Sequence, residues 1–305
     1  MSIQITFTKS ELNIMTGISL PKWIKPHLYS NKKFSDLSKA ELEDLKNRIK
    51  NFQDDDPLVS VVIPAWNEAD NIFRTLSSLA GSTTKHRVEI IVVNNNSTDN
   101  TQNIINELGV RNYFEPKQGI SHARQCGLDN AKGKYLLCAD SDTFYPPKWI
   151  DLMIRPMIKN KNITGVYGRY AFIPPEGVSR FSMWIYERVV GILVRIRKYN
   201  REFINVMGFT MGLVTEIGRT TGGFKVKDAR VYANSRDSEY FTEESEDGTM
   251  ALNLKKKGKL KLITNPNAVV FTSSRRIEYD GGVWKSFKQK LEVHSKRLIE
   301  YITGK

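Results

Sequence analysis

Two aspartates separated by one residue, Asp140 and Asp142 with Ser141 between them, directly follow the apolar run YLLCA at residues 135–139. The run is too short for a helix and lacks polar alternation, so we expect a strand buried on both faces. In open α/β sheets, ligands bind at the carboxyl ends of the strands, where this pair would lie. Carboxylate oxygens there suit Mg²⁺ or Mn²⁺ holding a diphosphate. An isolated triplet of this kind also fits a solvated turn.

A second acidic pair, Glu246 and Asp247, begins the stretch EDGTMALNLKKKG, whose apolar residues predict a helix ending at Gly258. Taken alone, the pair fits acids that the helix dipole favours at a helix N-terminus without any chemistry. The lysine-rich stretch 255–261 is interpreted as the solvated end of this helix.

The elements that must position these acids recur along residues 58–142 as strand, polar loop and helix. Strands are expected at 58–64, 88–93, near 110–114 and at 135–139, with helices between them. This alternation predicts parallel strands joined by right-handed crossovers, with the polar loops at one edge. The fold class is therefore α/β, with a Rossmann-like, mostly parallel central sheet flanked by helices.

Composition limits the partners and the compartment. The 305 residues carry 46 Lys and Arg against 33 Asp and Glu, a formal charge of +13 that favours an anionic partner. Because the sequence has no nucleic-acid-binding signature, we expect no nucleic acid partner. No apolar run could cross a bilayer and no signal peptide is evident, so neither spanning helices nor secretion is expected. Cys126 and Cys138 fit buried thiols in a reducing cytoplasm. The oligomeric state stays open.

Five blocks, taken in order, resemble those of family 2 glycosyltransferases, inverting enzymes of the GT-A fold. The resemblance covers roughly residues 58–275, and its blocks are VSVVIPAWNE (59–68), VVNNNSTDNT (92–101), GISHARQCGLDNAKGKYLLCADSD (119–142), GGF (222–224) and SEDGTMALNLKKKG (245–258). It implies transfer of a sugar from a nucleotide diphosphate sugar, with UDP as the expected nucleotide, to an acceptor hydroxyl.

The resemblance also implies a donor site. Along the nucleotide base and ribose it places Pro64, Ala65, Asn67 and Glu68. Where the family usually has a base-contacting Asp, this chain has Asn94 or Asn95, and an amide can both donate to and accept from a base edge, which leaves the choice of base open. Lys117 and Arg124 match basic positions beside the base and phosphates, although Lys117 also fits ordinary solvation.

The implied metal is Mn²⁺ or Mg²⁺, with Asp142 as a direct ligand, Asp140 near ribose and metal, and Ser141 on the donor. A divalent cation neutralises the leaving diphosphate as a Lewis acid. Glycine at Gly223, in the GGF turn, allows close approach to the donor sugar. Arg275 or Arg276, after the apolar stretch AVVFT, could clamp phosphate with a guanidinium fork.

At the acceptor, the resemblance makes Asp247 the general base, with Glu246 assisting or binding acceptor. An inverting displacement needs a base on the face opposite the leaving diphosphate. Residues 58–142 would then form the nucleotide-binding half and 143–275 the acceptor half of one domain. Residues 1–57 are expected to form an N-terminal arm and helix, with Ser38 and Glu41 as its capping box, and 276–305 a C-terminal helix.

The segment 178–200 has apolar residues at helical spacing with interleaved arginines. Such a peripheral helix could lie in a membrane interface, its arginines on anionic headgroups. It could equally pack on the sheet or in a dimer interface. If this helix and the basic C-terminal helix face the same way, we expect a lipid-linked acceptor such as a polyprenyl-diphosphate sugar, at the inner face of the cell membrane, in cell-surface polysaccharide synthesis.

Three other readings compete. A processive synthase would carry membrane spans and a Q-x-x-R-W motif, and the sequence has neither. A sugar-phosphate nucleotidyltransferase would have a Gly-rich basic loop after its first strand, where this chain reads AWNE. A catalytically inactive basic adaptor would explain the asparagines at 94–96, but not the retained Asp140, Asp142 and Asp247.

Overall fold

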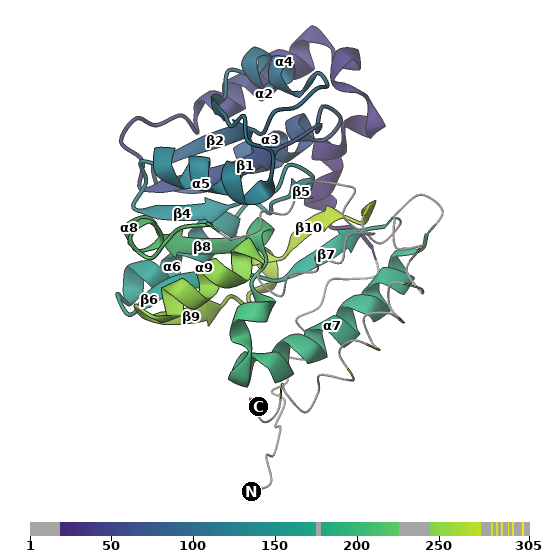
Figure 1. The fold of residues 1–305 in the computed structure, drawn as a ribbon. Coiled ribbons are helices and arrows are strands. Elements are labelled where there is room, and N and C mark those ends of the chain that lie inside the picture. Colours follow the sequence, from purple (N-terminus) through teal and green to yellow (C-terminus); the bar gives the residue numbers. More distant parts are fainter. Residues whose placement is uncertain are drawn as a thin grey trace, which may run out of the picture.

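The computed structural model describes residues 19–174, 178–225 and 245–275, together with residues 282, 285, 288, 292, 295 and 301. Its described part holds a seven-stranded sheet of order β3-β2-β1-β4-β8-β6-β9 and a three-stranded sheet of order β5-β10-β7. Helices flank the large sheet, and the small sheet lies at one side of it (Figure 1). The predicted α/β class with a mostly parallel sheet at its centre is confirmed.

The first half of the chain builds the parallel part of the large sheet. Four neighbouring strands pair in parallel: β1 (Val59–Ala65), β2 (Val88–Asn94), β3 (Arg111–Phe114) and β4 (Tyr135–Cys138). Three helices connect them in order: α3 (Ile72–Ala80), α4 (Thr101–Glu107) and α5 (Ile120–Asn130). Every residue of β1, β2 and β4 is buried, as their continuous apolar character predicts. The loops that leave β1, β2 and β4 therefore meet at one edge.

An antiparallel strand joins the two halves. β8 (Met211–Val214) lies between β4 and β6 (Ile163–Tyr167) and is antiparallel to both. The second half also contributes α6 (Trp149–Lys159), η3 (Glu202–Asn205), η4 (Gly208–Thr210), α8 (Thr215–Thr220) and η5 (Pro266–Ala268).

The lysine-rich stretch 255–261 is only in part the helix end predicted for it. Helix α9 (Glu246–Lys255) stops at the first of these lysines, and the chain then forms β9 (Lys259–Leu262) at the edge of the sheet. Lys259 and Lys261 are exposed, whereas the leucines after them are half-buried. This alternation is what an edge strand requires, because exposed lysines discourage pairing with another chain.

The small sheet brings Asp140 and Asp142 close to the residues that follow β10. It consists of β5 (Thr143–Phe144), β7 (Tyr170–Ile173) and β10 (Val270–Ser273). The backbone N–H of Ser273 donates to the carbonyl of Asp142 at 3.2 Å. Residues just after β10 therefore lie beside the Asp142 carboxylate.

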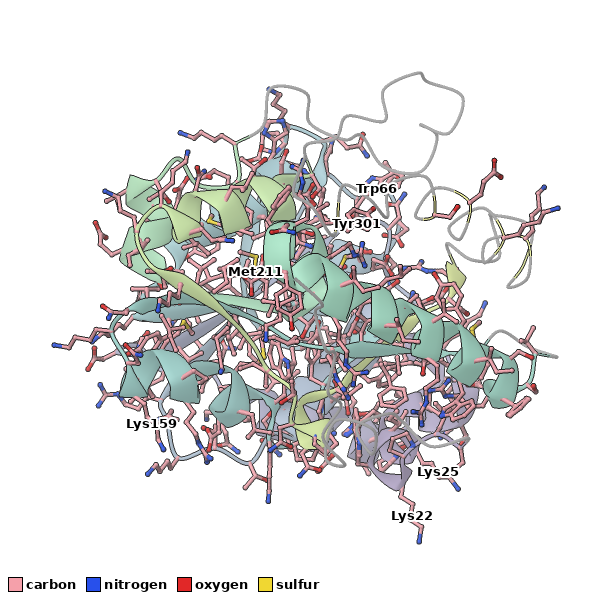
Figure 2. The ribbon with its side chains drawn as sticks, turned by 90° about the horizontal axis from the view of Figure 1, so that it is seen from below. Lys22, Lys25, Trp66, Lys159, Met211 and Tyr301 are labelled. Atoms are coloured by element: carbon pink, nitrogen blue, oxygen red, sulfur yellow. The ribbon has the colours of Figure 1, made fainter. Side chains whose placement is uncertain are left out.

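The N-terminal segment packs against the domain. It forms η1 (Lys22–Asn31), η2 (Phe34–Asp36) and α2 (Lys39–Lys50), and the predicted capping box between Ser38 and Glu41 is present. Leu45 and Ile49 of α2 are fully buried in the core that also includes α3. Lys22 and Lys25 point outward at the margin of the molecule (Figure 2).

The arginine-rich segment forms helix α7 (Arg180–Asn200), which runs along the outside of the small sheet (Figure 1). One of its faces packs on β7, where Phe172, Met183 and Tyr186 form a cluster. Tyr301 lies near the C-terminal end of α7 (Figure 2), and its carbonyl accepts a hydrogen bond from Asn200. None of the helices in the described ranges is long and apolar enough to cross a membrane.

Candidate active site

Helix α5 carries the cation at the centre of the site. A Cβ on Gly127 would lie 2.2 Å from Cγ1 of Val62, so this glycine lets α5 approach β1 closely. One turn earlier on the same helix, Arg124 is only 2% exposed. A buried guanidinium needs anionic or polar partners, because its desolvation is costly.

Those partners are two of the predicted functional acids, Asp140 and Asp247. Nη2 of Arg124 donates to Oδ1 of Asp140 at 3.0 Å, and Nη1 lies 3.0 Å from Oδ1 of Asp247. Asp140 follows β4, whereas Asp247 lies in the first turn of α9. The fold therefore brings the strand exit and the helix start together on one cation.

Asp247 is held by both the helix start and the turn η4. Ser245 caps α9 by accepting the N–H of Gly248, and Oδ2 of Asp247 accepts the N–H of Gly208 at 2.7 Å. Burial raises the pKa of Asp247 to about 7, with the nearby Glu246 adding to the effect and Arg124 opposing it. A carboxylate of this pKa can take up a proton at neutral pH.

Asp142 belongs to a second ionic cluster. Nη2 of Arg275 donates to Oδ2 of Asp142 at 2.8 Å and to Oε1 of Glu68 at 2.7 Å. Burial raises the pKa of Glu68 to about 7, Arg275 opposes this, and Asp142 adds to it. The predicted phosphate clamp Arg275 thus lies against the predicted metal ligand, while Arg276 lies outside the described residues.

The donor set at this corner is compatible with a substrate-bound divalent cation. Within the ranges that the structure describes, no group of three or more His, Cys, Asp or Glu side chains converges as a metal cage. Mg²⁺ needs no such cage, because it is usually held by one or two carboxylates together with substrate phosphates. Arg275 already neutralises the Asp142 carboxylate in this structure, so a metal ion bound by Asp142 would have to displace the guanidinium from it.

The loops after β1 and β2 are tied to each other. Asn67 adopts a positive φ of 53°, and its Oδ1 accepts the N–H of Thr98 at 2.8 Å. The N–H of Glu68 donates to Oγ1 of Thr101 at 2.8 Å. Pro64 and Ala65 are buried at the end of β1. The four residues expected along base and ribose therefore run from the end of β1 into a loop that is braced by the loop after β2.

The asparagines expected at the base have extensive protein contacts. Nδ2 of Asn95 donates to the carbonyl of Lys117 at 2.8 Å, and its Oδ1 accepts the N–H of Gly119 at 2.8 Å. Nδ2 of Asn94 donates to Gln102 at 2.6 Å. These amides shape the loop in which the Lys117 side chain is exposed. Base contacts by Asn94, Asn95 and Lys117 stay predictions.

The remaining predicted donor residues are Gly223 and Ser141. Gly223 has a φ of +67°, and a Cβ there would lie 2.0 Å from Oε1 of Gln125, the oxygen that accepts the N–H of Phe224. The GGF turn is thereby fixed to α5 beside Arg124. Ser141 is buried, and its carbonyl accepts a hydrogen bond from Thr75 of α3 at 2.8 Å.

Two contact residues have no counterpart in the sequence analysis. Gly208 donates its N–H to Asp247, and Tyr145 accepts the N–H of Asp140 at 2.9 Å while its hydroxyl donates to the carbonyl of Phe209 at 3.0 Å. A backbone donor has no side-chain signature. The only visible signal was the pair of glycines in MGFTMG, at residues 207–212.

Comparison with known sequences gives relatives that match part of this chain. It is 35% identical to the chondroitin synthase of Pasteurella multocida over 126 residues, which cover 40% of this chain and 13% of that protein. It is 33% identical over 120 residues to the Escherichia coli UDP-Glc:alpha-D-GlcNAc-diphosphoundecaprenol beta-1,3-glucosyltransferase WfaP, covering 37% of this chain and 45% of the relative. The chain thus matches less than half the length of either relative.

Comparison with solved structures supports the fold. The mannosyltransferase PcManGT of Pyrobaculum calidifontis, in complex with GDP-Man and Mn²⁺, superposes with a TM-score of 0.52 at 16% identity over 88% of this chain and 74% of that one. Staphylococcus aureus TarS in complex with UDP gives 0.50 at 17% identity, over 70% and 60% of the two chains. The model of Glycosyl transferase family 2 matches residues 60–215, just over half of the 305 residues. The chain belongs to Glycosyl transferase family 2.

Proposed function

We propose that the protein is an inverting glycosyltransferase that moves a hexose from a nucleotide diphosphate sugar, UDP-linked in the first instance, to an acceptor hydroxyl. The observation that carries this proposal is the position of Arg124 between Asp140 and Asp247. A donor-side acid and a candidate base thereby belong to one site, as a single displacement requires.

On the donor side, residues 64–68, at the end of β1 and in the braced loop after it, would receive base and ribose. Asp142, with Asp140 beside it, would hold Mn²⁺ or Mg²⁺, which when bound to the donor neutralises the leaving diphosphate. Arg275 already lies within hydrogen-bonding distance of Asp142, so its fork can turn to a phosphate that arrives there. The GGF turn is fixed to α5 beside Arg124 by Gln125, and it would border the donor sugar.

On the acceptor side, Asp247 would take the proton of the attacking hydroxyl as the new glycosidic bond forms and the bond to the diphosphate breaks. Its pKa of about 7 keeps a large ionised fraction at neutral pH. Glu246 is 9% exposed at the same helix start and would bind the acceptor or assist Asp247. Attack from this side inverts the anomeric centre.

For the acceptor, we infer a lipid-linked glycan. The outward face of α7 presents Phe181, Ile192 and Tyr199, which are 49%, 51% and 78% exposed, with Arg188 over the ring of Trp184 at 4.6 Å. Exposed aromatic and aliphatic side chains next to arginines suit an anionic membrane surface. The name of WfaP specifies a diphosphoundecaprenol acceptor, which supports the same class here. Helix α7 would then pack on the small sheet with one face and contact lipid with the other.

The test is a panel of nucleotide sugars with Mn²⁺ or Mg²⁺, scored for release of nucleoside diphosphate in the presence of a lipid-linked acceptor. The proposal expects metal-dependent release from one donor, abolished by EDTA and by Asp142→Ala. Lys159→Ala, a change of an exposed lysine at the end of α6 and at the margin in Figure 2, is the control and should leave release unchanged. Metal-independent release, or release unaffected by Asp142→Ala, would contradict the proposed donor site.

A further inference from the structure

The turn η4, Gly208–Thr210, contacts Asp247 directly and is connected to Asp140 through Tyr145. Its first residue donates the N–H of Gly208 to Oδ2 of Asp247 at 2.7 Å. The carbonyl of its second residue, Phe209, accepts a hydrogen bond from the Tyr145 hydroxyl at 3.0 Å. The same hydroxyl oxygen accepts the N–H of Asp140 at 2.9 Å. One short turn thus links the helix start that carries Asp247 to the strand exit that carries Asp140.

Residue 208 has no room for a side chain. A Cβ there would lie 1.5 Å from Nη1 of Arg124 and 1.9 Å from its Cζ, far inside any real contact distance. Arg124 cannot withdraw easily, because it is buried and its two ends are engaged by Asp140 and Asp247. The φ of Gly208 is outside the left-handed region, so alanine would be opposed by this contact and not by the backbone.

The two oxygens of Asp247 therefore have different partners. Oδ2 accepts the N–H of Gly208, and Oδ1 lies 3.0 Å from Nη1 of Arg124. Two contacts from different directions fix both the plane and the rotation of the carboxylate. A carboxylate oxygen has two lone pairs, so Oδ2 keeps one beside its bond to Gly208, whereas Oδ1 is a buried atom.

We propose that Gly208 is a positioning residue for the base: its N–H fixes one oxygen of Asp247, and its lack of a side chain lets Arg124 fix the other. This inference rests on the proposed function of Asp247. The charged groups that face Asp247 are Arg124, Glu246 and Asp140. Arg124 lowers the pKa of Asp247, whereas Glu246 and Asp140 raise it, so loss of the Arg124 contact would raise this pKa further.

The test is Gly208→Ala, compared with Gly81→Ala as a matched control. At Gly81, a Cβ would meet the His27 ring at 3.2 Å and the Ser78 carbonyl at 3.3 Å, much longer contacts than those at Gly208. Gly208→Ala is expected to lower kcat at least about a hundredfold, as small displacements of catalytic groups do, with donor affinity retained. The acid limb of its pH profile should move to higher pH, which a general loss of folding would not cause.

Two further variants separate the possible failures. If Asp247→Asn keeps wild-type turnover, the proposed role of Asp247 fails; if Asp247→Asn is slow while Gly208→Ala matches Gly81→Ala, only the positioning role fails. Should Gly208→Ala alone be too unstable to purify, it is combined with Arg124→Ala. The proposal expects the double variant to be as stable as Arg124→Ala alone, because the clashing group is gone. A further loss of stability in the double variant would overturn the proposal.

Discussion

Asp140 and Asp247 share one buried cation: Arg124 donates to Oδ1 of Asp140 at 3.0 Å and lies 3.0 Å from Oδ1 of Asp247. The arginine is nearly inaccessible to solvent, so neither acid can be treated as an isolated surface charge. Removing the cation would leave two partly buried carboxylates close to each other. The same residue therefore supports both the stability of the site and the ionised form of Asp247.

Arg124→Ala should destabilise the protein strongly. Breaking a buried ion pair by removing one partner costs about 3–5 kcal/mol, because the other charge stays buried without compensation. The free energy of unfolding, measured with urea, should fall by an amount of this order. Arg155→Ala, at an exposed position on α6, should change it by less than about 0.5 kcal/mol. Equal effects of the two substitutions would contradict the structural role of Arg124.

Arg275→Gln should weaken binding of the nucleoside diphosphate. The guanidinium bridges Glu68 and Asp142, and the variant would lose its charge-assisted bond to phosphate. Titration calorimetry of UDP with Mn²⁺ should therefore show a Kd raised about tenfold or more. Arg87→Gln, which removes surface ion pairs with Asp54 and Asp56, should leave this Kd unchanged. Unchanged affinity in Arg275→Gln would exclude a phosphate contact.

Much of the fold could be predicted because its signals are local. Continuous apolar runs gave β1, β2 and β4, and the polar residues after them had to meet at one edge. β8 was missed because MGLV is too short to show a pattern, and its antiparallel pairing with β4 depends on the fold as a whole. The lysines of β9 resembled a helix end because edge strands also carry exposed charge.

Those residues of the site whose side chains belong to the family motifs could be predicted from the sequence. Asp140 and Arg124 were expected near the donor and Asp247 at the acceptor, but their sharing of one ion-pair system depends on contacts between distant segments. The contact of Gly208 with Asp247 could not be predicted, because it uses a backbone N–H. The Asn95 amide was assigned to a base, and only the fold shows that it binds backbone groups of its own loops.

Turnover should depend on pH through Asp247. Its pKa is raised to about 7, and a general base must be ionised, so kcat/KM should be low at pH 5.5, rise through about pH 7 and level off above it. Glu68 has a pKa raised to a similar value, so Glu68→Gln separates the two groups. The acid limb should persist in Glu68→Gln. If the acid limb disappears in Glu68→Gln, it reports the titration of Glu68 and not of Asp247.

Membrane contact through α7 should be sensitive to single side chains. Ile192→Ser removes an aliphatic group that is 51% exposed on α7 and should reduce co-sedimentation with anionic vesicles. Ile158→Ser, at a residue 44% exposed on α6, is the matched control and should sediment like the wild type. High salt should weaken binding of all three proteins, since headgroup attraction is screened. Equal sedimentation of the two variants would argue against an α7 surface.

The most direct measurement is the rate of the chemical step in Asp247→Asn, by single-turnover release of nucleoside diphosphate, with donor affinity determined on the same sample. Asparagine keeps the size of the side chain and an acceptor for the Gly208 N–H but cannot take the substrate proton. We expect unchanged donor affinity and a step slowed at least about a hundredfold. A wild-type rate in this variant, with donor bound, would show that Asp247 is not the base.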